Sequence, residues 1–204
     1  KENLKELIDS DWKKSEFNLT NNDLKLIEYV VNTFENAKII GSLLKIKPSK
    51  GYLVVGDKIN KLRKTTVGGV FTNEFVLYGM KRLSDLLRLA HFMSLKYDVM
   101  ITNPPYLSIS GFDKEIKEYF GDNYPNSKSD MFAMFMETEF VKDNGFRTLV
   151  NPDSWMFLTS YEKLRTKIIS FETIISMTHH GMGEFDAVVQ TTSFIIRNSI
   201  TKDY

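Results

Sequence analysis

The sequence YDVMITNPPY, at residues 97–106, joins a short apolar run to two prolines that have an amide before them and an aromatic ring after them. A run of this length and composition predicts a buried strand at 98–102. Proline has no backbone N–H, so the strand must end where the prolines begin. A turn is the simplest interpretation of such a motif. However, α/β folds bind their ligands at the carboxyl ends of strands, so the motif is also a candidate site.

The rest of the chain alternates between helical and strand-like patterns, which predicts an α/β fold with a mostly parallel sheet. We expect helices at 22–36, 84–95, 113–120, 130–142 and 160–170, and strands at 38–44, 98–102, 146–150, 173–177 and 192–197. Asn22 or Asp23 is expected to cap the first helix and Ser84 the second, while Asn144-Gly145 is expected to end the fourth. The last two strands lie close together in sequence, which predicts an antiparallel strand at one edge. Residues 45–80 are expected to form an irregular or hairpin insert, because glycines interrupt short β-like runs there.

The composition excludes several classes of protein. The 204 residues contain no cysteine and three histidines, which rules out disulfides and thiolate metal sites and argues against structural zinc; we expect no metal. A formal net charge of +1 means that any binding to nucleic acid must come from local patches. The chain has no apolar run of about 18 residues and no signal peptide pattern, so we expect no membrane association and a cytoplasmic location.

The residue types in Asn103-Pro104-Pro105-Tyr106 suit one chemical task, the methylation of an amine on a planar base. The Asn103 carboxamide oxygen and the Pro104 carbonyl can each accept one amine N–H, which holds the nitrogen for attack. Two successive prolines stiffen the backbone and preset the direction of that carbonyl. Tyr106 offers a ring on which the base can stack, worth roughly 1–3 kcal/mol.

With these residues and the segments KYDVMITNPPYLSISGF and YPNSKSDMFAMFMETEF, the chain resembles the N6-adenine-specific DNA methyltransferases. More narrowly, it looks like the large methyltransferases of the BREX phage-defence (PglX) group and the related type IIG restriction–modification enzymes. The resemblance implies a Rossmann-like fold, S-adenosylmethionine as methyl donor, and an adenine flipped out of double-stranded DNA. It implies amine binding by Asn103 and Pro104 and stacking on the adenine by Tyr106, with Phe185 as a second candidate for stacking.

The same resemblance suggests further site residues and a boundary. Asp130 and Phe132 match the segment against the methionine end of the donor, and Ser42 stands where relatives place an acid for its adenine. Lys114, Lys117 and Lys128 are candidates for contact with DNA. The Gly-rich donor loop of the family is absent from these 204 residues. We therefore expect the chain to be the C-terminal part of a catalytic domain, inactive alone, with the donor-binding half and the DNA-specificity region elsewhere.

Other interpretations remain open at this point. Protein-glutamine and RNA-guanine methyltransferases use the same four-residue motif, and a DNA-binding or assembly module in a defence complex needs no chemistry at all. The basic cluster at 58–64 is more simply a solvated surface than a phosphate-binding patch. His179-His180 is more simply a loop after a strand than a ligand pair, and no nuclease pattern is visible.

Overall fold

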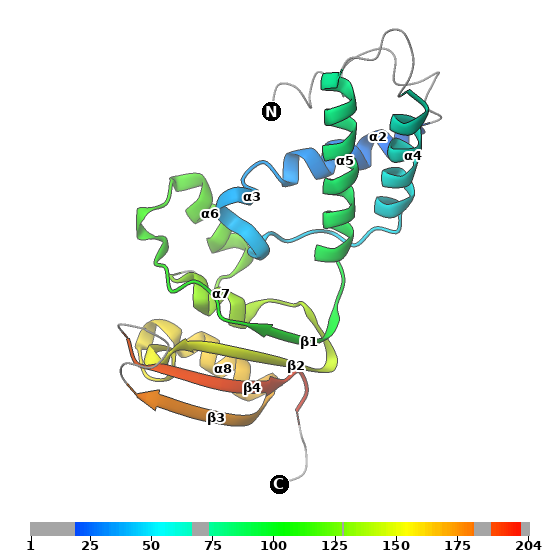
Figure 1. The fold of residues 1–204 in the computed structure, drawn as a ribbon. Coiled ribbons are helices and arrows are strands. Elements are labelled where there is room, and N and C mark those ends of the chain that lie inside the picture. The colour runs from blue at the N-terminus through cyan, green and yellow to red at the C-terminus, as the bar shows by residue number, and fades with distance from the viewer. Residues whose placement is uncertain (1–18, 67–73, 128, 182–188, 201–204) are drawn as a thin grey trace. The chain divides into compact units, whose positions relative to one another are not determined.

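The computed structural model describes residues 19–66, 74–127, 129–181 and 189–200 (Figure 1). The chain divides into two compact units, with the boundary between Leu95 and Lys96. Across the described residues, none of the helices combines the length and apolar character needed to cross a membrane. The first unit is helical and the second contains the whole described sheet, so each is considered separately.

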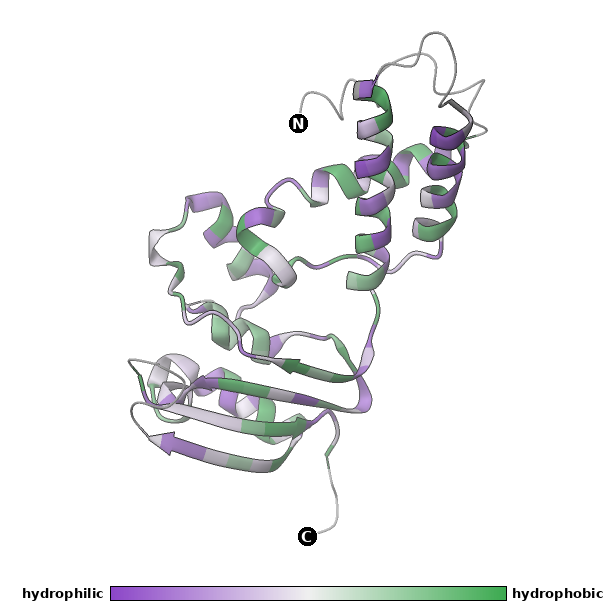
Figure 2. Ribbon diagram, in the orientation of Figure 1, coloured by the Kyte–Doolittle hydropathy of each residue, from purple (hydrophilic) through white to green (hydrophobic). Residues whose placement is uncertain are grey.

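The helical unit consists of α2 (Asn21–Thr33), α3 (Ala37–Ile40), a 3-10 turn (Gly41–Leu43), α4 (Gly51–Thr66) and α5 (Glu74–Met93). Its core comes from apolar residues at helical spacing, namely Ile27 and Val30 of α2, Tyr52, Val55 and Ile59 of α4, and Met80, Leu83, Leu87 and Ala90 of α5. Figure 2 shows α5 with alternating hydrophobic and hydrophilic bands, as expected of a helix with one buried side.

α4 and α5 lie close together at Gly56. A Cβ on Gly56 would lie 3.6 Å from Leu87 Cβ and 3.7 Å from the Ser84 carbonyl oxygen, which is ordinary van der Waals contact. Ser84 Oγ donates to the Gly56 carbonyl at 3.1 Å. Ser84 is therefore an interhelical contact inside α5 and not the N-cap that the sequence suggested.

Several sequence expectations for this unit were wrong. Residues 38–44 form helical turns instead of a strand, because Ile40, Leu43 and Leu44 are buried at a spacing of three and four residues. Residues 45–80 contain α4 and the start of α5 rather than a hairpin. The first helix is confirmed, but its cap is Thr20, whose hydroxyl accepts from the Asp23 N–H in a capping box.

The second unit contains four strands, namely β1 (Tyr97–Thr102), β2 (Val141–Pro152), β3 (Thr173–Gly181) and β4 (Thr191–Arg197), with helices α6 (Lys114–Asn123), α7 (Met131–Glu137) and α8 (Glu162–Phe171). The strand order is β1-β2-β4-β3, which Figure 1 shows from top to bottom with α8 behind the strands. β1 pairs with β2 in parallel, and β4 is antiparallel to both β2 and β3.

The direction of the strands confirms the α/β class. β1, β2 and β3 run the same way, and only β4 is reversed. The antiparallel pair at one edge is also as expected, with β4 one place in from that edge because it lies between β2 and β3. β1 forms the other edge of the described sheet, where Val99 is 52% exposed and Ile101 77% exposed.

One face of the sheet is covered by α7 and α8. The buried cluster there unites residues from both helices, from β2 and β4, and from the 3-10 turns (Asp153–Met156 and Thr159–Tyr161): Phe132, Ala133, Met136, Leu149, Trp155, Tyr161, Leu164, Ile168, Phe194 and Ile196. Burial of this apolar surface holds the helices on the sheet and fixes the end of β2 relative to α7.

The predicted helix at 130–142 was too long. α7 ends at Glu137, and the chain is already in β2 at Val141. Asn144, with φ of 63°, turns inside this strand and does not end a helix. Gly145 is required by proximity, since a Cβ there would lie 2.7 Å from the carbonyl oxygen of Asp98 on β1.

This close approach predicts the effect of adding one methyl group. Gly145→Ala forces a shift of the backbone between β1 and β2 and is expected to destabilise the chain by about 1–3 kcal/mol. Gly121→Ala in α6 is the control, because a Cβ there meets nothing within 4 Å; it should be stabilising by roughly 0.5–1 kcal/mol. Urea denaturation of both variants tests this, and equal midpoints for the two would contradict the packing account.

Candidate active site

The motif lies where β1 ends, as the sequence predicts. The β1–β2 ladder runs to the pair Thr102 and Leu149, and Asn103 follows immediately. Asn103 is exposed while Pro104 is buried, so the motif is anchored at Pro104 and Asn103 remains accessible to solvent. The strand predicted at 146–150 is part of β2, and its residues 146–149 pair with β1 in the same ladder.

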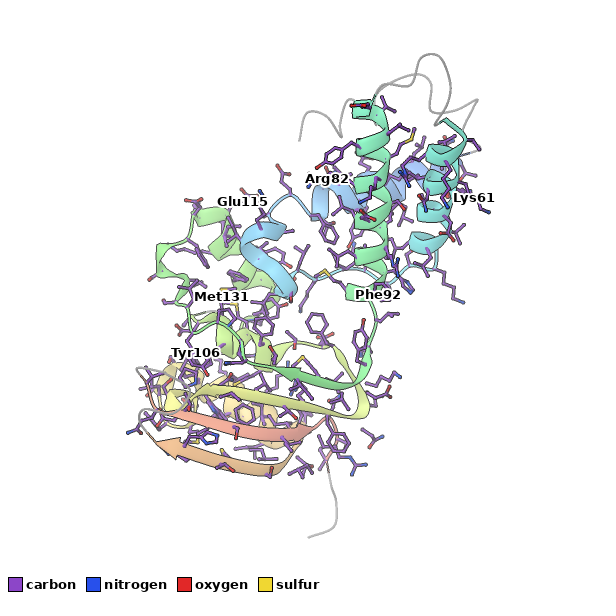
Figure 3. All side chains as sticks on the ribbon, viewed as in Figure 1. Lys61, Arg82, Phe92, Tyr106, Glu115 and Met131 are labelled. Carbon is purple, nitrogen blue, oxygen red and sulfur yellow. The ribbon has the colours of Figure 1, made fainter. Side chains whose placement is uncertain are left out.

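The Tyr106 side chain contacts both the first residue of the motif and strand β2. Its hydroxyl lies 3.1 Å from Oδ1 of Asn103 and 2.9 Å from the carbonyl oxygen of Val150. Burial raises the pKa of Tyr106, so the hydroxyl keeps its proton in the neutral range. Tyr106 as a residue is 37% exposed, so its side chain is accessible to a ligand. Figure 3 labels Tyr106 on the loop that follows β1.

A chain of aromatic rings supports Tyr106 from α7. Its ring packs edge-on against Phe132, with 6.3 Å between centroids, and Phe132 packs against Tyr161 at 5.6 Å. Phe132 is only 4% exposed, so its ring belongs to the core and acts on the site by supporting Tyr106.

Asp130 lies directly before α7, and its carboxylate is oriented by Tyr161. The Tyr161 hydroxyl donates to Oδ2 of Asp130 at 2.5 Å. Burial is the main cause that raises the pKa of Tyr161 above its usual value, and the nearby Asp130 carboxylate is the second cause. The hydroxyl therefore keeps its proton and remains a donor. Asp130 itself is half-buried and therefore keeps access to solvent.

Backbone hydrogen bonds join the loop after the motif to the start of α7. The Met131 N–H donates to the Leu107 carbonyl at 2.9 Å, and Ser108 forms a β-bridge with Asp130. Asn103, Tyr106 and Asp130, which the sequence placed in one site, are thus brought together by a continuous set of contacts.

A buried glutamate fixes the segment between α6 and α7. Glu137 is 5% exposed, and its two carboxylate oxygens accept from the Asn126 backbone N–H, the Asn126 side-chain amide and the Ser127 hydroxyl. These charge-assisted bonds hold the residues just before the Asp130 segment in place. Nothing in the sequence motif pointed to this role for Glu137.

Of the other predicted residues, Lys114, Lys117 and Ser42 lie in the described part of the chain. Lys114 and Lys117 are exposed on α6, where Lys114 lies 3.5 Å from Glu118 in an i,i+4 pair. Lys128 and Phe185 lie outside the described residues. Ser42 is exposed on the 3-10 turn of the helical unit and does not lie in the strand that the sequence predicted at 38–44. The roles predicted for these residues stay predictions.

Sequence reasoning missed one contact of the motif, with the Val150 carbonyl, and one buried polar side chain next to it in the sequence, Asn151. The Val150 carbonyl is a backbone group, so no side-chain pattern identifies it. Asn151, the next residue, is fully buried, and neither atom of its carboxamide has a hydrogen-bond partner among the described residues. The available signal in the sequence was an amide side chain at the end of an apolar strand. An unpaired buried amide is unusual, because most buried polar groups in proteins are paired.

The two adjacent histidines lie within β3 instead of in a loop. His179 Nε2 is 3.0 Å from Oδ2 of Asp153, and His180 Nε2 is 2.8 Å from the Ser193 hydroxyl. The Gly181 N–H donates to Nδ1 of His179, which places the proton of a neutral ring on Nε2 facing Asp153. Within the described ranges, no three histidine or acidic side chains are grouped as metal ligands.

The fold and the motif together define an α/β domain with an amide, a stiff carbonyl and an aromatic ring at the end of a parallel strand. Residues 12–185 match the family model described as Eco57I restriction-modification methylase. The match covers most of the chain, and the chain belongs to this family.

Two curated relatives are large enzymes. The chain is 34% identical over 183 residues to adenine-specific methyltransferase BrxX of Escherichia coli O9:H4 (strain HS), covering 87% of this chain and 15% of the relative. It is also 34% identical over 177 residues to adenine-specific methyltransferase PglX of Lacticaseibacillus casei (strain Zhang), covering 82% and 14%. The chain therefore spans about one seventh of the length of these relatives.

Among solved structures, one match is a crystal structure described as that of a class I S-adenosylmethionine-dependent methyltransferase from Listeria monocytogenes. The sequence identity is 15% and the TM-score is 0.44, over 94% of this chain and 64% of that one.

The contact between Tyr161 and Asp130 predicts an energetic coupling. A hydrogen bond from a buried hydroxyl to a carboxylate is worth about 1.5–3 kcal/mol, so Tyr161→Phe and Asp130→Ala should be non-additive by that amount. Urea denaturation of the two single variants and the double variant measures the coupling. Additive losses would show that the bond does not orient Asp130.

Proposed function

We propose that this chain forms the acceptor-binding part of a site-specific DNA methyltransferase. The full protein would transfer a methyl group from S-adenosylmethionine to N6 of an adenine flipped out of double-stranded DNA, in restriction–modification or phage defence. One observation carries the proposal: an exposed carboxamide, Asn103, is held at the end of β1 beside the partly exposed ring of Tyr106. Membership of the Eco57I methylase family supports it.

These groups match the needs of an aromatic amine. The lone pair of such an amine is delocalised into the ring, so the nitrogen is a poor nucleophile. Acceptance of its two N–H bonds by Asn103 Oδ1 and the Pro104 carbonyl orients the nitrogen and favours pyramidal geometry. As the new C–N bond forms, the bond between the methyl group and the donor's sulfur would break, leaving a neutral thioether. The nitrogen keeps both of its protons during this transfer, becomes cationic, and then releases one proton to solvent. No strong base is then required.

Tyr106 completes the acceptor site by stacking. A base extruded from the duplex loses stacking on its neighbours, and an aromatic side chain returns roughly 1–3 kcal/mol of that loss. The packing of Tyr106 on Phe132 and its hydrogen bonds fix the ring before the base arrives, so little conformational entropy is lost on binding.

The described residues fit the charge of the methyl donor in one place. Asp130 offers a half-exposed carboxylate that Tyr161 orients, and this suits the ammonium group of the donor's methionine part. When bound, S-adenosylmethionine supplies the methyl group. Phe132 would act through Tyr106, because its own ring is buried.

The partners follow from the same proposal. Double-stranded DNA is the substrate, with Lys114, Lys117 and Lys128 as candidates for phosphate contacts and Phe185 for a second contact with the flipped base. The two curated relatives are adenine-specific methyltransferases, which favours a DNA acceptor over the glutamine or guanine acceptors of other enzymes that carry this motif. Other defence-system subunits are further candidate partners.

Removal of the Asn103 carboxamide is the direct test of this proposal. In the full-length protein, Asn103→Ala should reduce N6-adenine methylation by about 10²–10³-fold, because one preorganised acceptor is lost. Binding to DNA should be retained, since phosphate contacts dominate affinity. Asn103→Asp keeps an acceptor and should retain part of the activity. The readouts are tritium transfer from labelled donor and gel-shift affinity.

Two controls separate the alternatives. Asn123→Ala at the end of α6 removes an amide far along the chain from the motif, one that bonds only its own helix at the Tyr119 carbonyl, and activity should be unchanged. Release factor and RNA are offered as acceptors in parallel. Methylation of either one without DNA, or full activity in Asn103→Ala, would contradict the proposal.

A further inference from the structure

The Tyr106 hydroxyl lies next to two oxygen atoms, and its single proton can be donated to only one of them. Oδ1 of Asn103 lies at 3.1 Å and the Val150 carbonyl oxygen at 2.9 Å. A tyrosine hydroxyl carries one proton and two lone pairs, so it donates one hydrogen bond and accepts others. With an oxygen on each side, one of the two contacts would bring two acceptors together.

The Tyr106 proton is better donated to the Val150 carbonyl than to Asn103. A carbonyl oxygen only accepts, and this one belongs to β2 just past the last pair of the ladder, Thr102 with Leu149. The next residues along β1 after Asn103 are prolines, which cannot donate to β2. The hydroxyl of Tyr106 thus supplies a hydrogen-bond donor where the prolines provide no backbone N–H.

Asn103 can adapt, whereas the carbonyl cannot. A carboxamide that turns by half a revolution about its last bond exchanges its oxygen for an NH2 group of nearly the same shape. With the nitrogen toward Tyr106, its N–H donates to the hydroxyl oxygen, and the hydroxyl donates to Val150. Every group in the set is then paired, as expected of a site that is preorganised.

We infer that the Tyr106 hydroxyl is a positioning group that selects the edge of Asn103 presented to the acceptor. It accepts from the Asn103 nitrogen and donates to the Val150 carbonyl, which turns Oδ1 of Asn103 outward. The raised pKa of Tyr106 agrees with a hydroxyl that stays protonated. The inference rests on the proposed function and adds to it a basis for recognition of the target base.

The chemical consequence is selectivity for a base with an amine over a base with a keto group. An outward oxygen accepts from the amine of adenine and repels the keto oxygen of hypoxanthine, its closest analogue. Without the hydroxyl, the carboxamide presents either edge at little cost, and its NH2 group can donate to the keto oxygen. Loss of one oxygen atom from Tyr106 should therefore relax discrimination while the ring still stacks.

The test uses the full-length protein and Tyr106→Phe, with duplexes that carry adenine or hypoxanthine at the target position. The dissociation constant for hypoxanthine divided by that for adenine should fall by roughly tenfold in Tyr106→Phe. The single-turnover rate on adenine should fall by roughly three- to tenfold, the size expected for one lost hydrogen bond. The difference in the cost of flipping the two bases cancels between variants. Tyr78→Phe is the control, because that hydroxyl accepts from Arg82, one turn further along the exposed side of α5.

A second substitution separates orientation from other roles of the hydroxyl. In Asn103→Asp both edges of the side chain accept, so there is no orientation to select. The double variant Asn103→Asp with Tyr106→Phe should regain the preference for adenine that Tyr106→Phe loses. A purely structural role for the hydroxyl would give no such recovery.

The outcomes are distinct. Parental rate and parental preference in Tyr106→Phe would overturn the inference, as would a double variant that stays unselective. Loss of folded structure by circular dichroism in Tyr106→Phe would assign the hydroxyl to stability and overturn it as well. Failure of the parent protein to methylate adenine would instead contradict the proposed function, whatever the variants do.

Discussion

The structure of the candidate site depends on one constraint: two prolines follow β1, and neither can donate a backbone hydrogen bond to β2. The parallel ladder therefore stops at Thr102, and the chain leaves the sheet with Asn103 exposed. The Tyr106 hydroxyl then takes the place of the missing donor at the Val150 carbonyl. The chain therefore continues from β1 into a stiff loop that holds the Asn103 amide, the Pro104 carbonyl and the Tyr106 ring close together.

The packing of the second unit extends that rigidity to Asp130. Phe132 and Tyr161 connect Tyr106 to the buried cluster on the covered face of the sheet, and Tyr161 orients the Asp130 carboxylate. Glu137 fixes the segment before α7 through buried hydrogen bonds. The proposed sites for an amine and for a cationic donor are therefore supported by one core, which is the arrangement that precise positioning of two reactants requires.

The sequence predicted the sheet unit well and the helical unit poorly, for physical reasons. Strands such as 98–102 and 146–150 are short apolar runs bounded by turn residues, and the motif carries its own chemistry. Residues 38–44 are equally apolar, and only burial at helical spacing decided their conformation. Gly51 and Gly56 suggested breaks in this region, yet both lie within α4, whose buried residues pack against α5. The Val150 carbonyl and Glu137 escaped notice because they act through tertiary contacts.

A structure of the full-length protein with target DNA and a non-reactive analogue of the methyl donor tests the central claim most directly. We expect the N6 atom of an extruded adenine within about 3 Å of Asn103 Oδ1 and of the Pro104 carbonyl oxygen, with the adenine stacked on Tyr106. An adenine that remains in the duplex, or that is bound away from Asn103, would contradict the assignment of this loop as the acceptor site.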